Sequence, residues 1–309
     1  MSGRLLHTGN AVIDVVLEVP DLPERGGDVL ATRTSVTPGG GFNVMAAAAR
    51  QGSAVGYAGA HGTGPFGDQV RAALRGEGIE ILLPPRADRD TGFVTCLIDS
   101  EGERTFVTSP GAEATLGRDD LSALAPDPDD VVYVSGYSLM YPTNRSALSD
   151  WLPEINAAAT VVVDPGPLAD QIPAPVLALV LARADWWSCN QREAAMLTGL
   201  DGPGDAARAL GRRLARGSAL VRTGADGCLL LQDGAVHVVP GYAVDAIDLN
   251  GAGDAHTGTF IAALMHNLDP RTAALHANAA AALATTVHGP ATAPDARALL
   301  DFLRTEHCA

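Results

Sequence analysis

Short apolar runs alternate with stretches of helical periodicity over most of the sequence. Such alternation favours an α/β fold, in which a parallel or mixed sheet carries helices on both faces. The predicted strands are residues 5–9, 54–60, 131–135, 160–164, 186–189, 218–222 and 227–232. The predicted helices are residues 43–51, 66–76, 144–156, 175–182, 191–198, 203–215, 253–268, 270–287 and 294–304.

Two segments break this alternation. Ala11–Pro38 and Asp90–Pro110 carry β-branched residues and turn residues without a helical period. The second reads as a hairpin, with strands Gly92–Asp99 and Arg104–Ser109. We therefore expect one domain over residues 1–309, with a discontinuous β-sheet lid built from about 11–38 and 90–110. The lid is also a candidate homodimer interface.

The charge balance limits the function. The net charge is −15, from 36 acidic and 21 basic residues, and this argues against a nucleic-acid partner. All 21 basic residues are arginines. Without lysine there is neither a Walker A loop nor a lysine Schiff base. If the protein binds phosphate, backbone amides, arginine and metal must hold it.

Nothing in the sequence predicts a membrane segment or a structural metal site. No apolar run approaches the roughly 18 residues that a spanning helix needs, and Met1 to Arg4 lead directly into a strand-like run. We therefore expect a cytoplasmic protein without a membrane partner. Its cysteines lack metal-binding spacing and are expected to be reduced thiols: Cys96, Cys189, Cys228 and Cys308.

The segment from Asp248 to Asp254 carries the chemistry. Gly251 and Gly253 flank Ala252, so a ligand can approach the backbone without meeting a Cβ. The helix that follows presents free N–H groups and the positive end of its dipole, which together favour phosphate. Asp254 is placed to accept a proton from a hydroxyl. The segment predicts phosphoryl transfer onto an alcohol.

Four other motifs each have a structural and a functional interpretation. The glycine loop before Asn43 is either a capped helix start or a surface for a polyhydroxy ligand. Asn190 and Glu193 form either a capping box or a site beside metal-bound water. Thr223 to Gly227 is either a plain turn or a nucleotide contact. Asp14 is either a surface acid or a ligand for sugar hydroxyls.

A further glycine motif, Gly62 to Gly67, fits the dinucleotide pattern G-x-G-x-x-G between a strand and a helix. Pro65 removes one amide from it, and a tight turn is the alternative. His256 follows Asp254 by two positions, and residues i and i+2 of a helix do not face each other. We therefore do not expect His256 to contact Asp254.

Together these motifs resemble the PfkB (ribokinase-like) carbohydrate kinases over essentially the full chain. Gly39-Gly40 with Asn43 is similar to the first signature of the family. Asp248 to Asp254 is similar to its second, D-x-x-G-A-G-D. Between them lie residues that match the family's N-x-x-E motif and its nucleotide-contact turn: Asn190, Glu193, Thr223, Gly224 and Gly227.

The resemblance implies a three-layer α/β/α sandwich with a small β-sheet lid, and ATP and Mg²⁺ as cosubstrates. It makes Asp254 the catalytic base and Gly251, Ala252 and Gly253 the anion hole. It assigns Asp14, Gly40, Asn43 and Asp254 to the acceptor, and Asn190, Thr223, Gly224, Gly227 and Asn278 to the nucleotide. It places Glu193 near Mg²⁺, through water. Related kinases often use a monovalent cation such as K⁺, here beside Asp248, Asn250, Val287 and Gly289.

Several functions therefore stay open. The first is an ATP-dependent kinase for a small sugar or sugar-like acceptor, and the second is a nucleoside kinase of the same fold. A non-catalytic binding or regulatory protein would keep the fold without turnover. A dinucleotide-dependent oxidoreductase would use the Gly62–Gly67 turn. Leu249 and Asn250 stand where the family commonly has threonines, and the sequence does not identify the acceptor.

Overall fold

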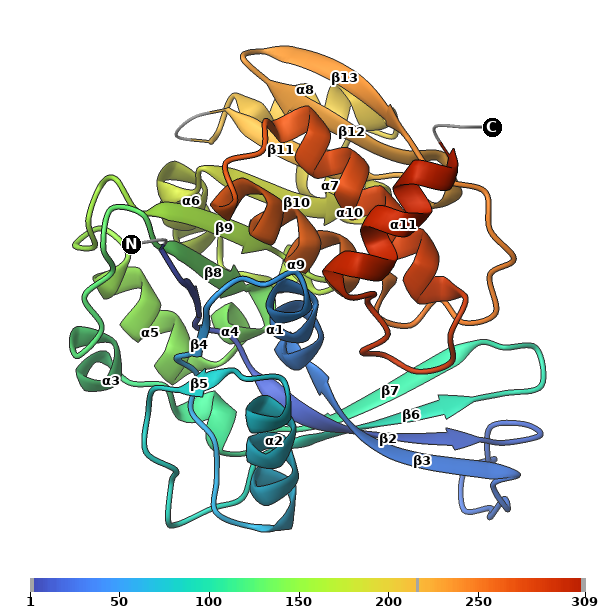
Figure 1. The fold of residues 1–309 in the computed structure, drawn as a ribbon. Helices are drawn as coiled ribbons and strands as arrows, with labels where there is room; N and C mark the ends of the chain where they lie inside the picture. The colour runs from blue at the N-terminus through green and yellow to red at the C-terminus, as the bar shows by residue number, and fades with distance from the viewer. Residues whose placement is uncertain (1–2, 215–216, 307–309) are drawn as a thin grey trace.

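The computed structural model describes residues 3–214 and 217–306, in which nine strands form the main sheet (Figure 1). Their order is β13-β12-β11-β10-β9-β8-β1-β4-β5, and all pairs are parallel except those that β12 forms with β11 and β13, which are antiparallel. The predicted α/β fold is confirmed. The strands are β1 (Leu5–His7), β4 (Val55–Tyr57), β5 (Glu80–Ile81), β8 (Val131–Ser135), β9 (Thr160–Asp164), β10 (Trp186–Asn190), β11 (Ser218–Arg222), β12 (Gly227–Gln232) and β13 (Ala235–Pro240).

Helices cover both faces of this sheet because its strands are apolar on both sides. In β8, Val132 and Val134 pack with one layer of helices, while Val131 and Tyr133 pack with the other. One layer holds α1 (Gly41–Arg50), α2 (Pro65–Gly76), α9 (Ala252–Met265), α10 (Pro270–Thr285) and α11 (Ala296–Glu306). The other holds α3 (Arg118–Ser122), α4 (Gly136–Met140), α5 (Pro142–Trp151), α6 (Ala174–Arg183), α7 (Gln191–Thr198) and α8 (Pro203–Gly211).

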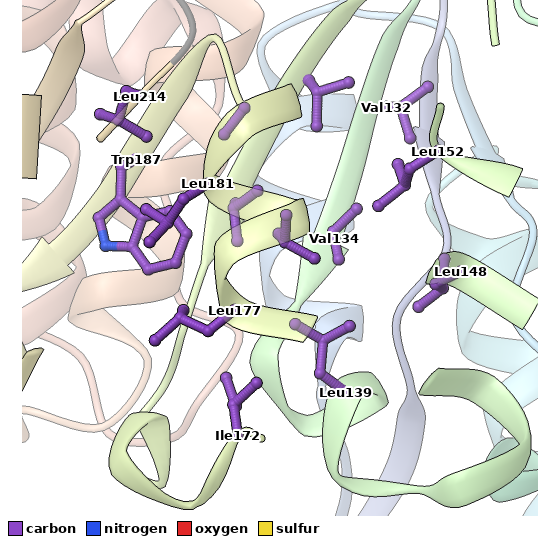
Figure 2. Close-up of a cluster of buried hydrophobic side chains, with 14 of the residues drawn as sticks. Val132, Val134, Leu139, Leu148, Leu152, Ile172, Leu177, Leu181, Trp187 and Leu214 are labelled. Atoms are coloured by element: carbon purple, nitrogen blue, oxygen red, sulfur yellow. The ribbon is translucent and has the colours of Figure 1, made fainter. Parts of the chain in front are cut away.

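The largest part of the core lies under this second layer of helices. Figure 2 shows Val132 and Val134 of β8 among leucines of the covering helices, with Trp187 of β10 nearby. Trp187 is fully buried. Truncating an aromatic side chain of this kind typically costs about 3–5 kcal/mol. This core fixes the strands whose ends form the site.

A second, smaller sheet projects from the main body (Figure 1). Its order is β3-β2-β6-β7, with β2 (Ala11–Glu18), β3 (Arg33–Gly40), β6 (Phe93–Ile98) and β7 (Arg104–Ser109). We call this sheet the lid. The predicted hairpin is present as the antiparallel pair β6–β7, and β2 joins the two excursions by pairing in parallel with β6. The strand β3 continues two residues beyond the predicted 38 and leads directly into α1.

Element ends differ from the sequence prediction in several places. The predicted strands 5–9 and 54–60 shorten to three residues each, and the helix predicted from 144 begins at Pro142. Asn43 does not cap α1, although a capped helix start was one of the two interpretations of this loop. The helix already begins at Gly41, and Gly40 is its N-cap with φ +61°. Only glycine adopts this backbone without cost, so the glycine loop itself starts the helix.

Short 3₁₀ turns complete the described chain: η1 (Ala112–Thr115), η2 (Ala169–Gln171) and η3 (Gly224–Asp226). Across the described residues, no helix combines the length and apolarity that crossing a membrane requires. Cys96, Cys189 and Cys228 are buried free thiols, as predicted, and Cys308 lies outside the described residues.

Candidate active site

A cavity of about 520 Å³ lies between the carboxyl ends of the central strands and the lid. The strands β8, β9, β10 and β11 are neighbours, and the last residues pair between β8 and β9 and between β10 and β11. Ser135 pairs with Asp164, and Asn190 pairs with Arg222. All four residues line the cavity. This is the edge at which open parallel sheets bind ligands.

The cavity brings together nine of the predicted site residues. They come from the lid, from the starts of α1, α7 and α9, and from the loop before α9: Asp14, Gly40, Asn43, Asn190, Glu193, Asn250, Gly251, Gly253 and Asp254. Residues that we did not predict complete the lining, among them Asn10, Arg104, Tyr137, Asp164 and Arg222.

Asp254 lies in the first turn of α9, beside Gly251 and Gly253. The nitrogen Nδ2 of Asn43 donates a hydrogen bond to Oδ2 of Asp254, at 2.9 Å. Close packing of α1 and α9 makes this possible, because a Cβ on Gly258 would lie 2.3 Å from the Val44 carbonyl oxygen. Asn43 therefore points its side chain at the predicted base.

The environment makes Asp254 a strong proton acceptor. Burial raises its pKa to about 7, and the nearby carboxylates of Asp164 and Asp14 act in the same direction. The hydrogen bond from Asn43 and the charge of Arg222 oppose this shift. A general base works best when its pKa lies near the working pH. A pKa of about 7 is compatible with the predicted role of Asp254 as a general base.

Asp14 approaches the cavity from β2 and lies against the glycine loop. A Cβ on Gly39 would lie only 2.0 Å from Oδ2 of Asp14, so a larger residue there would displace the Asp14 carboxylate. Burial raises the pKa of Asp14 to about 6. The oxygen Oδ1 of Asn43 is buried and finds no hydrogen-bond partner among the described residues. The Asp14 carboxylate can therefore accept hydrogen bonds from a molecule in the cavity.

Arg222 holds two carboxylates at the end of the sheet. Its Nη1 donates to Oδ2 of Asp164 at 3.1 Å and to the hydroxyl oxygens of Ser188 and Thr257 at 2.5 and 3.1 Å. Its Nη2 lies 3.7 Å from Oε2 of Glu193. Sequence reasoning missed this cluster. The available signals were that Asp164 ends an apolar strand and that Arg222 immediately precedes the turn predicted to contact the nucleotide.

Both interpretations of Asn190 and Glu193 are compatible with the structure. The two residues form a capping box, because the Asn190 side chain accepts from the Glu193 N–H and Glu193 accepts from the Asn190 N–H. They also line the cavity, where burial and the neighbouring Asp164 raise the pKa of Glu193. The cap fixes the direction in which the Glu193 carboxylate points.

The donor set fits Mg²⁺ better than a metal held by the protein alone. Across the described residues, no group of three or more His, Cys, Asp or Glu side chains converges on one point. Asp164 and Glu193 supply two carboxylates on the same wall of the cavity. Mg²⁺ is usually bound by one or two carboxylates, several waters and the phosphates of a substrate.

Of the predicted nucleotide residues, Asn190 lines the cavity and the other four do not. Thr223, Gly224 and Gly227 form the turn between β11 and β12. Asn278 is buried on α10, where its Nδ2 donates to the carbonyl oxygens of Val239 and Pro240 at 3.1 and 2.9 Å. Nε2 of His256 lies 3.1 Å from Oδ1 of Asn278. The His256 ring therefore faces Asn278 of α10.

The residues predicted to surround a monovalent cation lie in two adjoining loops. Oδ1 of Asp248 accepts from the Asn250 N–H at 2.9 Å, and Oδ2 accepts from the Gly289 N–H at 3.0 Å. Val287 lies in the second loop and is half exposed. Ala252 opens α9 between the two glycines that line the cavity.

The Gly62–Gly67 turn is not a dinucleotide seat. The carboxylate of Asp90 accepts hydrogen bonds from the backbone N–H groups of Phe66 and Gly67, at 3.0 and 2.8 Å. These amides at the start of α2 are the ones that a pyrophosphate would need. Asp90 already occupies these amides, so this turn offers no pyrophosphate site of the kind that the oxidoreductase hypothesis requires.

Comparison with known proteins agrees with this geometry. Residues 3–297 match the model of the pfkB family carbohydrate kinases. An uncharacterized sugar kinase of Escherichia coli is 31% identical over 97% of this chain and 98% of its own length. A fructokinase of Klebsiella pneumoniae is 31% identical over 95% of this chain and 96% of its own.

A ribokinase structure from Thermotoga maritima superposes with a TM-score of 0.85 at 23% identity, over 97% of this chain and 99% of that one. The three-layer architecture with its separate small sheet is therefore the ribokinase-like fold. Together with the match along nearly the whole sequence, the fold and the site lead to one conclusion: the chain belongs to the pfkB family of carbohydrate kinases.

Proposed function

We propose that this phosphotransferase moves the γ-phosphoryl group of ATP to a hydroxyl of a small, neutral, sugar-like acceptor, with Asp254 as the general base. The observation that carries the proposal is the position of Asp254. It lies in the first turn of α9 beside Gly251 and Gly253, and its pKa is about 7. A proton acceptor and an anion seat thus share one wall of the cavity.

The bond changes follow from this arrangement. The acceptor oxygen bonds to the γ-phosphorus while the bond from that phosphorus to the bridging oxygen breaks, and ADP leaves. The proton of the acceptor hydroxyl passes to Asp254. Asn43 donates its hydrogen bond to Oδ2 of Asp254, so Oδ1 is the oxygen that would accept the proton of the acceptor hydroxyl. The amides of Gly251, Ala252 and Gly253 stabilise charge on the phosphoryl oxygens, which is the main term in phosphoryl transfer.

The remaining residues would hold the nucleotide and its metal. We place the nucleotide against Asn190 and the turn of Thr223, Gly224 and Gly227, at the end of β11. Glu193 would hold Mg²⁺ through water, and Mg²⁺ would neutralise charge on the phosphates. Asn278 would act from behind this turn, because it holds the end of β13 through the Val239 and Pro240 carbonyls.

The acceptor surface favours a neutral molecule with several hydroxyl groups. Asp14 offers its carboxylate oxygens to the cavity, beside the backbone of Gly40. Hydroxyl groups can donate to these atoms. An acidic acceptor would instead place its charge near Asp14 and Asp254.

The direct test is an ADP-release assay with purified protein, ATP and Mg²⁺ over pentoses, hexoses, keto-deoxy acids, sugar phosphates and nucleosides. We expect the highest kcat/KM with a neutral sugar. A preference for a sugar acid or a sugar phosphate would contradict the neutral acceptor. A preference for a nucleoside would support the second kinase hypothesis. ATP hydrolysis that no acceptor stimulates would favour a regulatory protein.

The pKa of Asp254 predicts a pH dependence. Below about pH 7 the base becomes protonated, so kcat/KM should fall roughly tenfold per pH unit as pH decreases. Stability should change in the opposite direction. The folded state holds this proton between pH 3.8 and about 7 while the unfolded state has released it, so the free energy of unfolding falls as pH rises through that window.

Initial rates at saturating ATP across this range would test the prediction, and chemical denaturation at the same pH values would test the stability. Asp14 also titrates, near pH 6. Asp14→Asn should therefore lower activity and yet keep the step near 7. A profile that stays flat down to the ordinary carboxyl range would contradict the assigned pKa.

Two further expectations stay predictions. A monovalent cation beside Asp248, Asn250, Val287 and Gly289 would show as a higher kcat in K⁺ than in tetramethylammonium. A homodimer through the lid would show in light scattering. Val36 and Val107 on the lid strands are 45% and 62% exposed, which gives such a contact apolar surface.

A further inference from the structure

An ion pair joins the lid to the loop that carries the anion hole. Arg104 begins β7, the last strand of the lid, and its side chain lines the cavity. Its Nη2 donates to Oδ1 of Asp248 at 3.0 Å, across 144 positions of sequence. Asp248 begins the loop that leads into α9. The lid therefore contacts the loop that carries the anion hole.

Asp248 determines where that loop lies. Its carboxylate accepts from the Asn250 N–H within the loop and from the Gly289 N–H in the neighbouring loop. Backbone bonds from Ile247 and Asp248 to the Thr285 carbonyl hold the same region. The next contact is tight, because a Cβ on Gly251 would lie 1.7 Å from the Pro290 carbonyl oxygen. A shift of Asp248 would therefore move the amides of the anion hole.

The pair is partly shielded from water. The side chains of Arg104 and Asp248 are 34% and 18% exposed. Burial alone would raise the pKa of Asp248, but hydrogen bonds from the Gly289 and Asn250 amides and the Arg104 guanidinium hold it below its usual value. Hydrogen bonds between charged groups are stronger than neutral ones. Asp248 therefore carries a negative charge, and Arg104 of the lid supplies the positive charge that pairs with it.

We propose that Arg104 is a positioning residue for phosphoryl transfer. When the lid closes over the acceptor, the ion pair between Arg104 and Asp248 holds the anion-hole loop in its working position. This inference rests on the proposed kinase function. An open lid would leave Asp248 without its guanidinium partner and the loop less well placed. The enzyme would thereby transfer phosphoryl groups to an enclosed acceptor in preference to water.

The test compares Arg104→Gln, Asp248→Asn and the double variant in the ADP-release assay, with the acceptor that the wild-type protein uses best. Arg104→Gln should lower kcat about tenfold, as the loss of a hydrogen bond to a charged group does. The KM of the acceptor should stay within about twofold. The double variant should be no slower than Asp248→Asn, because the two residues act through one contact.

Arg33→Gln is the matched control. Arg33 lies on lid strand β3 and pairs with Glu18, 3.4 Å away, where both side chains are well exposed. It should leave kcat and the melting temperature nearly unchanged. If Asp248→Asn does not fold, Arg104→Gln alone still tests the inference through kcat and the KM of the acceptor. In this variant the ratio of ATP hydrolysed to acceptor phosphorylated should rise.

Three results would overturn the inference. A raised KM of the acceptor at unchanged kcat would make Arg104 a substrate contact. Losses that multiply in the double variant would separate Arg104 from Asp248. Equal losses in Arg33→Gln would show a general effect on the lid. Failure of the kinase proposal looks different, because the wild-type protein itself would then phosphorylate no acceptor.

Discussion

Replacing Asp254 by asparagine is expected to lower kcat by about 10²-fold or more, the usual contribution of a general base. Asparagine has the same shape, and its side-chain oxygen can still accept the hydrogen bond from Asn43. It cannot take the proton of the acceptor hydroxyl. Since asparagine also removes a carboxylate whose pKa burial raises, the fold should be retained with equal or greater stability near neutral pH.

Single-turnover assays and circular dichroism on the same preparation would measure the two effects separately. Asp205→Asn serves as the control. Asp205 is an aspartate in the first turn of another helix, α8, and its side chain is 74% exposed. It should behave like the wild-type protein. Near-wild-type turnover by a folded Asp254→Asn protein would remove the general base from the mechanism.

The sequence predicted the local parts of this structure well. The hairpin of β6 and β7 followed from β-branched runs on either side of a turn, and α7 matches its predicted bounds. The loop from Asp248 to Asp254 was recognisable because glycine, a helix start and a carboxylate stand next to one another along the chain. Each of these features depends on residues that lie close to one another along the chain.

Contacts between distant segments could not be read from the sequence. Arg222 meets Asp164 across 58 positions of sequence and an intervening strand, so neither residue signals the other. Asn43 looked like a helix cap because caps are local features. Its actual partner is Asp254, which lies 211 positions away. Only the close approach of α1 and α9 brings these two side chains together.

The same distinction explains the lid. Both of its segments were predicted to be extended, because each lacks helical periodicity. Their assembly depends on the parallel pairing of β2 with β6, which sequence patterns do not specify. This pairing places Asp14 beside Val94, and both residues line the cavity. The acceptor surface thus arises from the register of two strands that are distant in sequence.

Gly251→Ala is the second substitution with a large expected effect, and it tests the anion hole. Gly251 has φ +77°, and a Cβ there would lie 1.7 Å from the Pro290 carbonyl oxygen. The left-handed backbone alone costs an alanine about 1–2 kcal/mol. The collision is the larger problem, because the loop must move to relieve it. A displaced amide should lower kcat about 10²–10³-fold, as the loss of one oxyanion-hole donor does.

Gly234→Ala separates displacement of the loop from backbone strain. Gly234 has φ +78°, in the turn between β12 and β13, and a Cβ there would meet nothing within 4 Å. Both variants should therefore lose similar stability from the backbone, and only Gly251→Ala should lose turnover. Steady-state kinetics and thermal denaturation of the pair would show this. Equal kcat in the two variants at equal melting temperature would mean that the amides after Gly251 do not hold the transferred phosphoryl group.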